Sequence, residues 1–502
     1  MSLVGVDLGT SGVRVVAVRA GDGTPLVGLA RPTSLRRPGP GLVTTDAEQC
    51  VAAVTGLLAE LAGHDAVAAD PVEAISFSVQ GEAVVPVDAA GLALAAAPVS
   101  MDQRGVPAAH RVEAELGAGQ VQRVTGQPLH PMFSIYKIAY GGPGWTGPAV
   151  RGYRCLGDYV AARLGARPAM DTTMAARTGG YDVGQRCWSA QLLAATGVPE
   201  ALLPEVVTPG TAVGGLAAAA AAATGLPAGT PIVVGSHDQA ASFWGAGGRP
   251  GTVSVFSFGS SDCLTVGSAG RPGRLDGTGL ASYPVTAGDV GDADGQWLTL
   301  AGTAAGGWAL DWFATLVGAA DAAQRDALFA AAAGTPAEVL VLPYLAGSGT
   351  LDNDPRARGA VVGLTLETSR AQLARAFLEA SAFELHKIIA AFAARCVPVG
   401  AVHAVGGGAR HAASLAIRAS AAGRALTAVP VDASARGAAL QAGVGVGRYT
   451  GLADLPAPPT LPAAVPDPTT TDWYAAQVRR YQDLYPALTP HDRSYDHDKE
   501  TR

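Results

Sequence analysis

A single carboxylate closes the first apolar run of the chain and is followed at once by small residues. The stretch reads VDLGTSGVR over residues 6–14, and the residues behind Asp7 are Gly9, Thr10, Ser11 and Gly12. A tight turn of this composition lets backbone N–H groups and two hydroxyls converge on one anion. Asp7 would repel a bare phosphate, so its position indicates Mg²⁺ between the two, while Arg14 adds positive charge. The alternative is a plain hairpin in which Asp7 caps the turn.

A second carboxylate follows another apolar run, in the segment VVGSHDQAA at residues 233–241. Asp238, at the carboxyl end of a buried strand that faces a cleft, is placed to accept a proton from a substrate hydroxyl. The segment is equally consistent with a helix N-cap before Ala240. The residues alone therefore leave a catalytic base and a structural cap open.

Two more glycine turns extend the pattern. Gly259, Ser260 and Ser261 resemble the first turn and stand about half a chain after it. Two such turns, one opening each half, predict a duplicated domain whose lobes face each other across a cleft, although Gly-Ser turns are common. The third turn, GGGAR at 406–410, precedes a helix expected at 412–422. There the backbone could approach a flat ring and the helix N-terminus an anion, or the glycines could serve packing alone.

These residues require a scaffold in which strands alternate with helices. Strand-like runs lie at 3–6, 13–18, 74–79 and 232–234, and 50–61 is typical of a helix. The fold class is therefore α/β, and 502 residues are enough for two domains. We divide the chain into three parts: lobes at 1–245 and 246–488, and a charged tail without fixed structure at 489–502. A short helix at 473–484 is expected to end before Pro486.

Composition narrows the possible partners and compartment. The net charge of −7 gives no electrostatic footprint for nucleic acid or an anionic membrane, and neither is expected as a partner. Five scattered cysteines without ligand spacing indicate free thiols in a reducing compartment. Asp7 interrupts the only early apolar run, which argues against a signal peptide, and prolines break the long uncharged segment 206–236. We expect a cytoplasmic protein.

Taken together, these segments resemble the FGGY family of carbohydrate kinases, from Val4 to about Tyr485. Eight motifs stand in the family's order: VDLGTSGVR at 6–14, SVQGE at 78–82, MDQR at 101–104, HDQ at 237–239, FGSS at 258–261, AGG at 305–307, PYLAGSGTLDNDPRARGAVVGL at 343–364 and GGGAR at 406–410. The resemblance implies a two-lobed, actin-like ATPase (ribonuclease H-like) fold with a central cleft. It also implies ATP on the second lobe, sugar mostly on the first, and Mg²⁺.

The resemblance assigns roles to individual residues. Asp238 matches the general base, and Asp7 matches the carboxylate near Mg²⁺. The first phosphate loop matches Thr10, Ser11, Gly12 and Arg14, and the second matches Gly259, Ser260 and Ser261. Positions around the nucleotide match Gly307, Asp311, Gly407, Gly408, Ala409 and Ala412. Lys137 matches a family lysine on a helix lining the lobe, and we expect it to be structural.

Sugar specificity is expected where carboxylate, amide and imidazole groups converge. The candidates are Gln80, Gly81, Glu82, Asp102, His237, Asp238 and Gln239. Glu82 and Gln239 resemble glycerol kinases, but Gly81 replaces their arginine, and xylulokinases usually carry Met-His at 81–82. His237 stands where the family has a small residue, so it either contacts substrate or fixes the loop through a backbone hydrogen bond.

The sequence thus predicts an ATP-dependent carbohydrate kinase that phosphorylates a terminal hydroxyl of a small sugar, with a ketopentose such as xylulose first. A glycerol-like polyol, a deoxy ketose or an aldonate are the alternatives, and related kinases are often homodimers. From other classes, a silent sugar-binding regulatory protein would have lost Asp7 or Asp238, and both are present. A heat-shock-type ATPase would need a peptide-binding domain after the ATPase unit.

Overall fold

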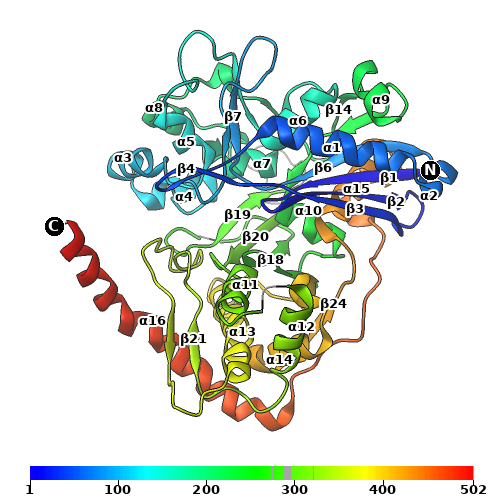
Figure 1. The fold of residues 1–502 in the computed structure, drawn as a ribbon. Helices are drawn as coiled ribbons and strands as arrows, with labels where there is room; N and C mark the ends of the chain where they lie inside the picture. The colour runs from blue at the N-terminus through cyan, green and yellow to red at the C-terminus, as the bar shows by residue number, and fades with distance from the viewer. Residues whose placement is uncertain (274, 286–294, 320, 501–502) are drawn as a thin grey trace.

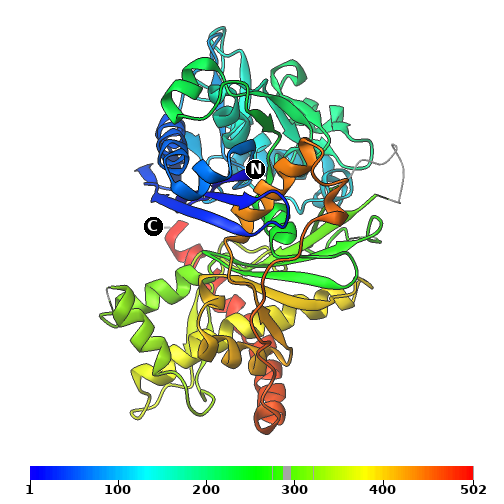
Figure 2. The ribbon, with the colours of Figure 1, turned by 90° about the vertical axis from the view of Figure 1, so that its right-hand side faces the viewer.

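The computed structural model describes residues 1–273, 275–285, 295–319 and 321–500. Two lobes lie one above the other, and the chain completes most of the first before it enters the second (Figures 1 and 2). Each lobe is built on a mixed sheet flanked by helices, as the α/β prediction requires. Within these described ranges, no helix combines the length and apolar character that a membrane span requires.

The first sheet places its central strand beside one parallel and one antiparallel neighbour. Its order is β14 (Ala212–Gly215), β15 (Pro231–Val233), β6 (Val72–Val79), β1 (Ser2–Leu8), β2 (Gly12–Arg19) and β3 (Pro25–Pro32), and β16 (Ser236–His237) also pairs with β6. β1 runs parallel to β6 and antiparallel to β2. β1 is buried along its whole length, which explains its nearly continuous apolar sequence.

The second sheet repeats this arrangement. Its order is β19 (Ala281–Pro284), β20 (Trp297–Gly302), β18 (Asp262–Ser268), β17 (Val253–Phe258), β23 (Ala401–Gly406) and β24 (Leu426–Ala428). The hairpin β17–β18 with its parallel neighbour β23 corresponds to the hairpin β1–β2 with β6. The predicted duplicated, two-lobed fold is confirmed, and the two similar turns occupy equivalent positions in it.

Helices cover both sheets. In the first lobe they are α1 (Ala47–Ala62), α2 (Asp65–Ala69), α3 (Val106–Leu116), α4 (Ala118–Thr125), α5 (Ser134–Tyr140), α6 (Leu156–Leu164), α7 (Thr172–Arg177), α8 (Ala190–Thr196), α9 (Ala218–Thr224) and α10 (Asp238–Gly245). The later ones are α11 (Gly307–Leu316), α12 (Ala322–Ala330), α13 (Arg370–Ala393), α14 (Ala412–Ala422), α15 (Ala433–Gly445) and α16 (Thr471–Glu500). Short strands complete the lobes: β4 (Arg36–Gly39), β5 (Leu42–Thr45), β7 (Val84–Val87), β8 (Ala97–Pro98), β9 (Gly152–Cys155), β10 (Ala169–Asp171), β11 (Tyr181–Asp182), β12 (Cys187–Trp188), β13 (Glu205–Val207), β21 (Leu340–Leu342) and β22 (Ala360–Val362).

Helices α10 and α15 pack closely where the lobes meet. A side chain at Gly437 would overlap the backbone carbonyl of Ala241, so only glycine permits this approach. Arg436 of α15 is fully buried and donates to the carbonyl oxygens of Gly23 (3.0 Å), Gly245 (2.8 Å) and Pro456 (3.0 Å). One guanidinium thereby joins three separate segments of the chain.

The C-terminal helix differs from the sequence expectation. A helix ending before Pro486 and a tail without regular structure were predicted, but α16 is helical from Thr471 to Glu500. Proline removes one backbone donor and does not end a helix whose neighbouring turns are held in place. Tyr474 and Tyr481 provide that hold, because both are buried and donate to Glu379 (2.7 Å) and Glu384 (2.6 Å) of α13.

Candidate active site

Asp7 lies at the end of β1 with both carboxylate oxygens occupied. Ser78 of β6 donates to Oδ1 at 2.7 Å, and Arg14 of β2 donates to Oδ2 at 3.0 Å. Arg14 also lies 3.4 Å from Asp432, the N-cap of α15. Burial and the charge of Asp432 raise the pKa of Asp7 to about 6, although Arg14 opposes them. The side chain therefore does not cap the turn, as the alternative reading required, and it carries charge that its neighbours only partly balance.

The first turn is a tight connection between β1 and β2. The backbone N–H of Gly9 donates to the carbonyl of Gly12 at 3.0 Å, and Thr10 Oγ1 donates to Gln80 Oε1 at 3.1 Å. A side chain at Gly12 would come within 2.7 Å of the carbonyl oxygen of Arg31, which explains the glycine. Ser11 is exposed at the tip. The predicted loop residues thus share one turn, beside Asp7 and the end of β6.

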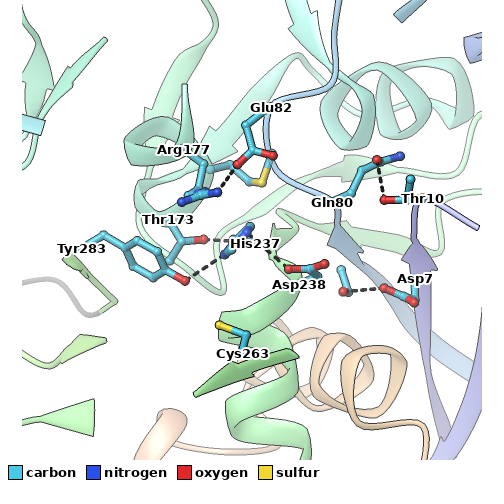
Figure 3. A network of polar contacts seen from close by, with 12 residues as sticks. Asp7, Thr10, Gln80, Glu82, Thr173, Arg177, His237, Asp238, Cys263 and Tyr283 are labelled. Atoms are coloured by element: carbon cyan, nitrogen blue, oxygen red, sulfur yellow. Dashed lines mark hydrogen bonds and ion pairs between the residues drawn. The ribbon is translucent and has the colours of Figure 1, made fainter. Parts of the chain in front are cut away.

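Asp238 is the first residue of α10, and His237 is the N-cap. The side chain of Asp238 is 29% exposed, and its Oδ1 lies 3.3 Å from His237 Nε2. Burial, Asp7 and Glu82 raise the pKa of Asp238 to about 7, and Arg177 opposes them. Figure 3 shows Asp238 between His237 and Asp7. A carboxylate with this pKa and partial exposure is suited to accept a proton near neutral pH.

Glu82 faces the same region from the loop after β6. Its carboxylate forms an ion pair with Arg177 of α7, and both side chains are buried. The backbone of Glu82 is left-handed, with φ of 72°, a conformation that costs a non-glycine residue energy. Ser134 Oγ and Lys137 Nζ each donate to its carbonyl oxygen at 3.1 Å. These two side chains hold the strained backbone, which agrees with a structural role for Lys137.

Gly81 explains one departure from the family pattern. A side chain at this position would lie 3.2 Å from Arg177 Nε and from the ring of His237. A larger residue at this position would therefore require Arg177 and His237 to move. Gln80 is buried next to Gly81, and Gln239 is partly exposed in the first turn of α10. Gln80, Gly81, Glu82, His237, Asp238 and Gln239 therefore surround one region.

Asp102 is placed differently from the other sugar candidates. Its carboxylate is fully buried and accepts from the backbone N–H of Val43 at 2.8 Å. Arg104 donates to both oxygens, through Nε at 2.7 Å and Nη2 at 3.0 Å. These bonds fix the loop before α3. The structure thus gives the Asp102 carboxylate partners that brace the loop, and its role toward a sugar stays a prediction.

The nucleotide candidates lie on elements of the second lobe. The backbone N–H of Gly307 donates to the carbonyl of Gly259 at 2.8 Å, so the second turn and the start of α11 are in contact. Ser260 and Ser261 share that turn between β17 and β18. Gly407, Gly408 and Ala409 form a short 3₁₀ turn directly before Ala412 begins α14. Asp311 is exposed, follows Gly307 by four residues on the same face of α11, and pairs with Arg325 at 2.9 Å.

Three residues of this region were missed in the sequence. Arg177 and Tyr283 lie in short segments without a motif, and Asp432 reads as an ordinary N-cap before an alanine-rich helix. Arg177 donates to Gln127 at 2.8 Å and lies over the ring of Phe133. The burial of Arg177, which requires a partner for the cation, is visible only in the folded chain.

Comparisons with known proteins agree with this geometry. Residues 2–245 match the N-terminal domain, and residues 254–446 the C-terminal domain, of the FGGY family of carbohydrate kinases. The glycerol kinase of Citrifermentans bemidjiense is 28% identical over 463 residues, 89% of this chain and 90% of that protein. The xylulose kinase of Streptomyces coelicolor is 31% identical over 357 residues, 68% of each. The crystal structure of xylulose kinase from Rhodospirillum rubrum has a TM-score of 0.84 at 28% identity, covering 98% of this chain and all of that one.

Duplicated lobes with equivalent turns, and a carboxylate at a helix start between them, define a phosphotransferase of the actin-like ATPase fold class. The matches to the two domain models identify one family within this class. The chain belongs to the FGGY family of carbohydrate kinases.

Proposed function

We propose that the protein transfers the terminal phosphoryl group of ATP to a terminal hydroxyl of a small sugar, with a ketopentose such as xylulose as the first candidate. A glycerol-like polyol, a deoxy ketose and an aldonate follow. The observation that carries the proposal is Asp238, a partly exposed carboxylate that shares its surroundings with Glu82, Arg177 and His237. Support for the sugar class comes from similarity to both xylulose and glycerol kinases.

Asp238 acts as the general base in this proposal. As the sugar hydroxyl oxygen attacks the phosphorus in line, the proton passes to the carboxylate, and ADP leaves. The backbone N–H groups and hydroxyls of the two turns receive the phosphate oxygens. Since Asp238 accepts a proton near pH 7, its ionised form is available under neutral conditions.

Asp7 is the residue proposed to hold Mg²⁺, which would offset charge on the phosphates when bound. Among the residues that the structure describes, no group of three or more His, Cys, Asp or Glu side chains is placed to hold a metal ion. Mg²⁺ characteristically uses one or two carboxylates and keeps several waters. A buried carboxylate whose charge is only partly balanced fits that donor set.

The test is coupled ADP release with ATP and Mg²⁺ across ketopentoses, deoxy ketoses, polyols and aldonates. We expect one compound to give turnover, and Asp238→Asn to lower kcat on it about 10²- to 10⁴-fold. Asp158→Asn makes the same chemical change at a buried aspartate of α6 outside the cleft and should leave kcat within about twofold of wild type. Full activity in Asp238→Asn would refute the assignment of the base.

The catalytically silent alternative has a separate signature. A sugar-binding protein would show thermal stabilisation by one compound of the panel without any ADP release above background. In that event the kinase proposal fails, while the sugar site around Glu82 stands. Turnover that is lost in Asp238→Asn excludes this alternative directly.

A further inference from the structure

Tyr283 reaches from the second lobe into the first. It belongs to β19, the edge strand of the second sheet, and its side chain is completely buried. Its hydroxyl lies 2.9 Å from His237 Nδ1, and the two rings meet edge to face with centroids 5.8 Å apart. A residue of one lobe therefore contacts the neighbour of the proposed base in the other lobe (Figure 3).

His237 connects this tyrosine to Asp238. While Nδ1 faces the Tyr283 hydroxyl, Nε2 lies 3.3 Å from Asp238 Oδ1. The backbone N–H of His237 donates to Thr173 Oγ1 at 2.9 Å, so the main chain of His237 is also held in place. The imidazole thus has a defined partner on each nitrogen, and the three side chains form one continuous chain of polar contacts across the lobes.

The contacts select one tautomer of His237. Burial and the charge of Arg177 lower the pKa of His237 well below its usual value, so the ring is neutral and has one N–H. If Nδ1 carried the proton, the Nε2 lone pair would face the ionised carboxylate of Asp238. With the proton on Nε2, the positive end of that N–H lies 3.3 Å from the Asp238 carboxylate, which is favourable, and Nδ1 accepts from the Tyr283 hydroxyl. The groups that face this chain from the surrounding elements are Asp7, Glu82, Asp171, Thr173, Arg177 and Cys263.

We propose that Tyr283 is a positioning residue that acts through His237: its hydroxyl holds the imidazole in the tautomer that keeps the Nε2–H beside Oδ1 of Asp238 and leaves Oδ2 for the sugar hydroxyl. This inference rests on the proposed function of Asp238 as the base. Because Tyr283 belongs to the nucleotide lobe, the base is oriented only when β19 is seated against α7. Sugar chemistry on one lobe is thereby linked to the position of the other.

The seating of β19 has additional contacts that do not involve His237. The backbone N–H of Ser282 donates to the carbonyl of Gly126 at 2.7 Å, and Thr172 Oγ1 donates to the carbonyl of Pro284 at 3.1 Å. These bonds hold the strand without the tyrosine hydroxyl. Removing that hydroxyl alone therefore changes the orientation of His237 while the lobes stay together. Thr172→Val is a matched control, because it removes a different hydrogen bond between α7 and β19.

The bridge itself is tested without substrate, by ¹⁵N NMR of the histidine rings in the full-length wild type and in Tyr283→Phe. We expect the His237 signals, assigned by their loss in His237→Gln, to report protonated Nε2 in the wild type. In Tyr283→Phe they should shift toward a mixture of tautomers. A proton on Nδ1 in the wild type, or identical spectra in the two proteins, would overturn the proposal whether or not a sugar is known.

The kinetic consequence is tested on the compound that the panel identifies. Tyr283→Phe should lower kcat about tenfold, the effect of one orienting hydrogen bond, with KM for sugar within about twofold. His237→Gln should lower kcat, and adding Tyr283→Phe to it should cause no further loss. Thr172→Val should keep kcat within about twofold of wild type. Independent, multiplying losses in the double variant, or an unchanged kcat in Tyr283→Phe, would refute the linkage.

Discussion

The ion pair between Glu82 and Arg177 makes a measurable contribution to stability. Removing one member of a buried pair typically costs about 3–5 kcal/mol, because the other charge stays buried without compensation. Arg177 keeps its bond to Gln127 and its contact with the ring of Phe133, and the charge of Asp238 acts on the same region. We therefore place Glu82→Gln at the lower end, about 3 kcal/mol of unfolding free energy.

The assay is equilibrium urea unfolding of the full chain, followed by circular dichroism above about pH 8 so that Asp238 is ionised. The control is Glu73→Gln, which breaks the pair between Glu73 and the exposed Arg448 and should lower the unfolding free energy much less. If the two variants unfold within about 0.5 kcal/mol of each other, burial does not set the strength of the Glu82 pair and the reasoning is wrong.

Two further predictions concern pH. Because burial, Asp7 and Glu82 raise the pKa of Asp238 to about 7, kcat/KM should rise about tenfold per pH unit below neutrality and level off above it, whereas a flat profile between about pH 5 and 8 would contradict the role of the base. Burial also raises the pKa of Asp158 to about 8, so the folded state keeps a proton that the unfolded state loses, and stability falls as pH rises from about 4 to 8. Asp158→Asn should therefore gain melting temperature relative to wild type as pH increases, and a constant difference would show that the carboxyl does not titrate in that range.

The fold could be predicted well from the sequence because its signals are local. The apolar run around Val4 to Leu8 and the Gly-rich turn behind it define a strand and a hairpin, and the same signals recur at Gly259. Segment 412–422 is helical over the whole predicted range. The exception, α16, depends on contacts between Tyr474 or Tyr481 and the distant helix α13, which no local pattern contains.

The site was harder to predict, because its chemistry depends on pairs far apart in the chain. Asp238 could be found from its position after a strand, but Tyr283, which contacts the neighbouring His237, comes from an edge strand without a motif. Arg177 closes a short helix and meets Glu82 only in the folded chain. Conversely, Asp102 has the residue type of a sugar ligand, but Arg104 and the backbone of Val43 occupy its carboxylate, a local arrangement that residue type does not reveal.

The charges around the cleft explain why a nucleotide would need an accompanying cation. Burial and neighbouring carboxylates hold the pKa values of Asp7 and Asp238 above the ordinary range: Asp432 acts on Asp7, and Asp7 and Glu82 act on Asp238. Of the nearby cations, Arg14 is already shared between Asp7 and Asp432, and Arg177 is paired with Glu82. A triphosphate entering this site would add charge of the same sign beside Asp7. Entry as a Mg²⁺ complex would reduce that repulsion, which is what the proposed role of Asp7 expects.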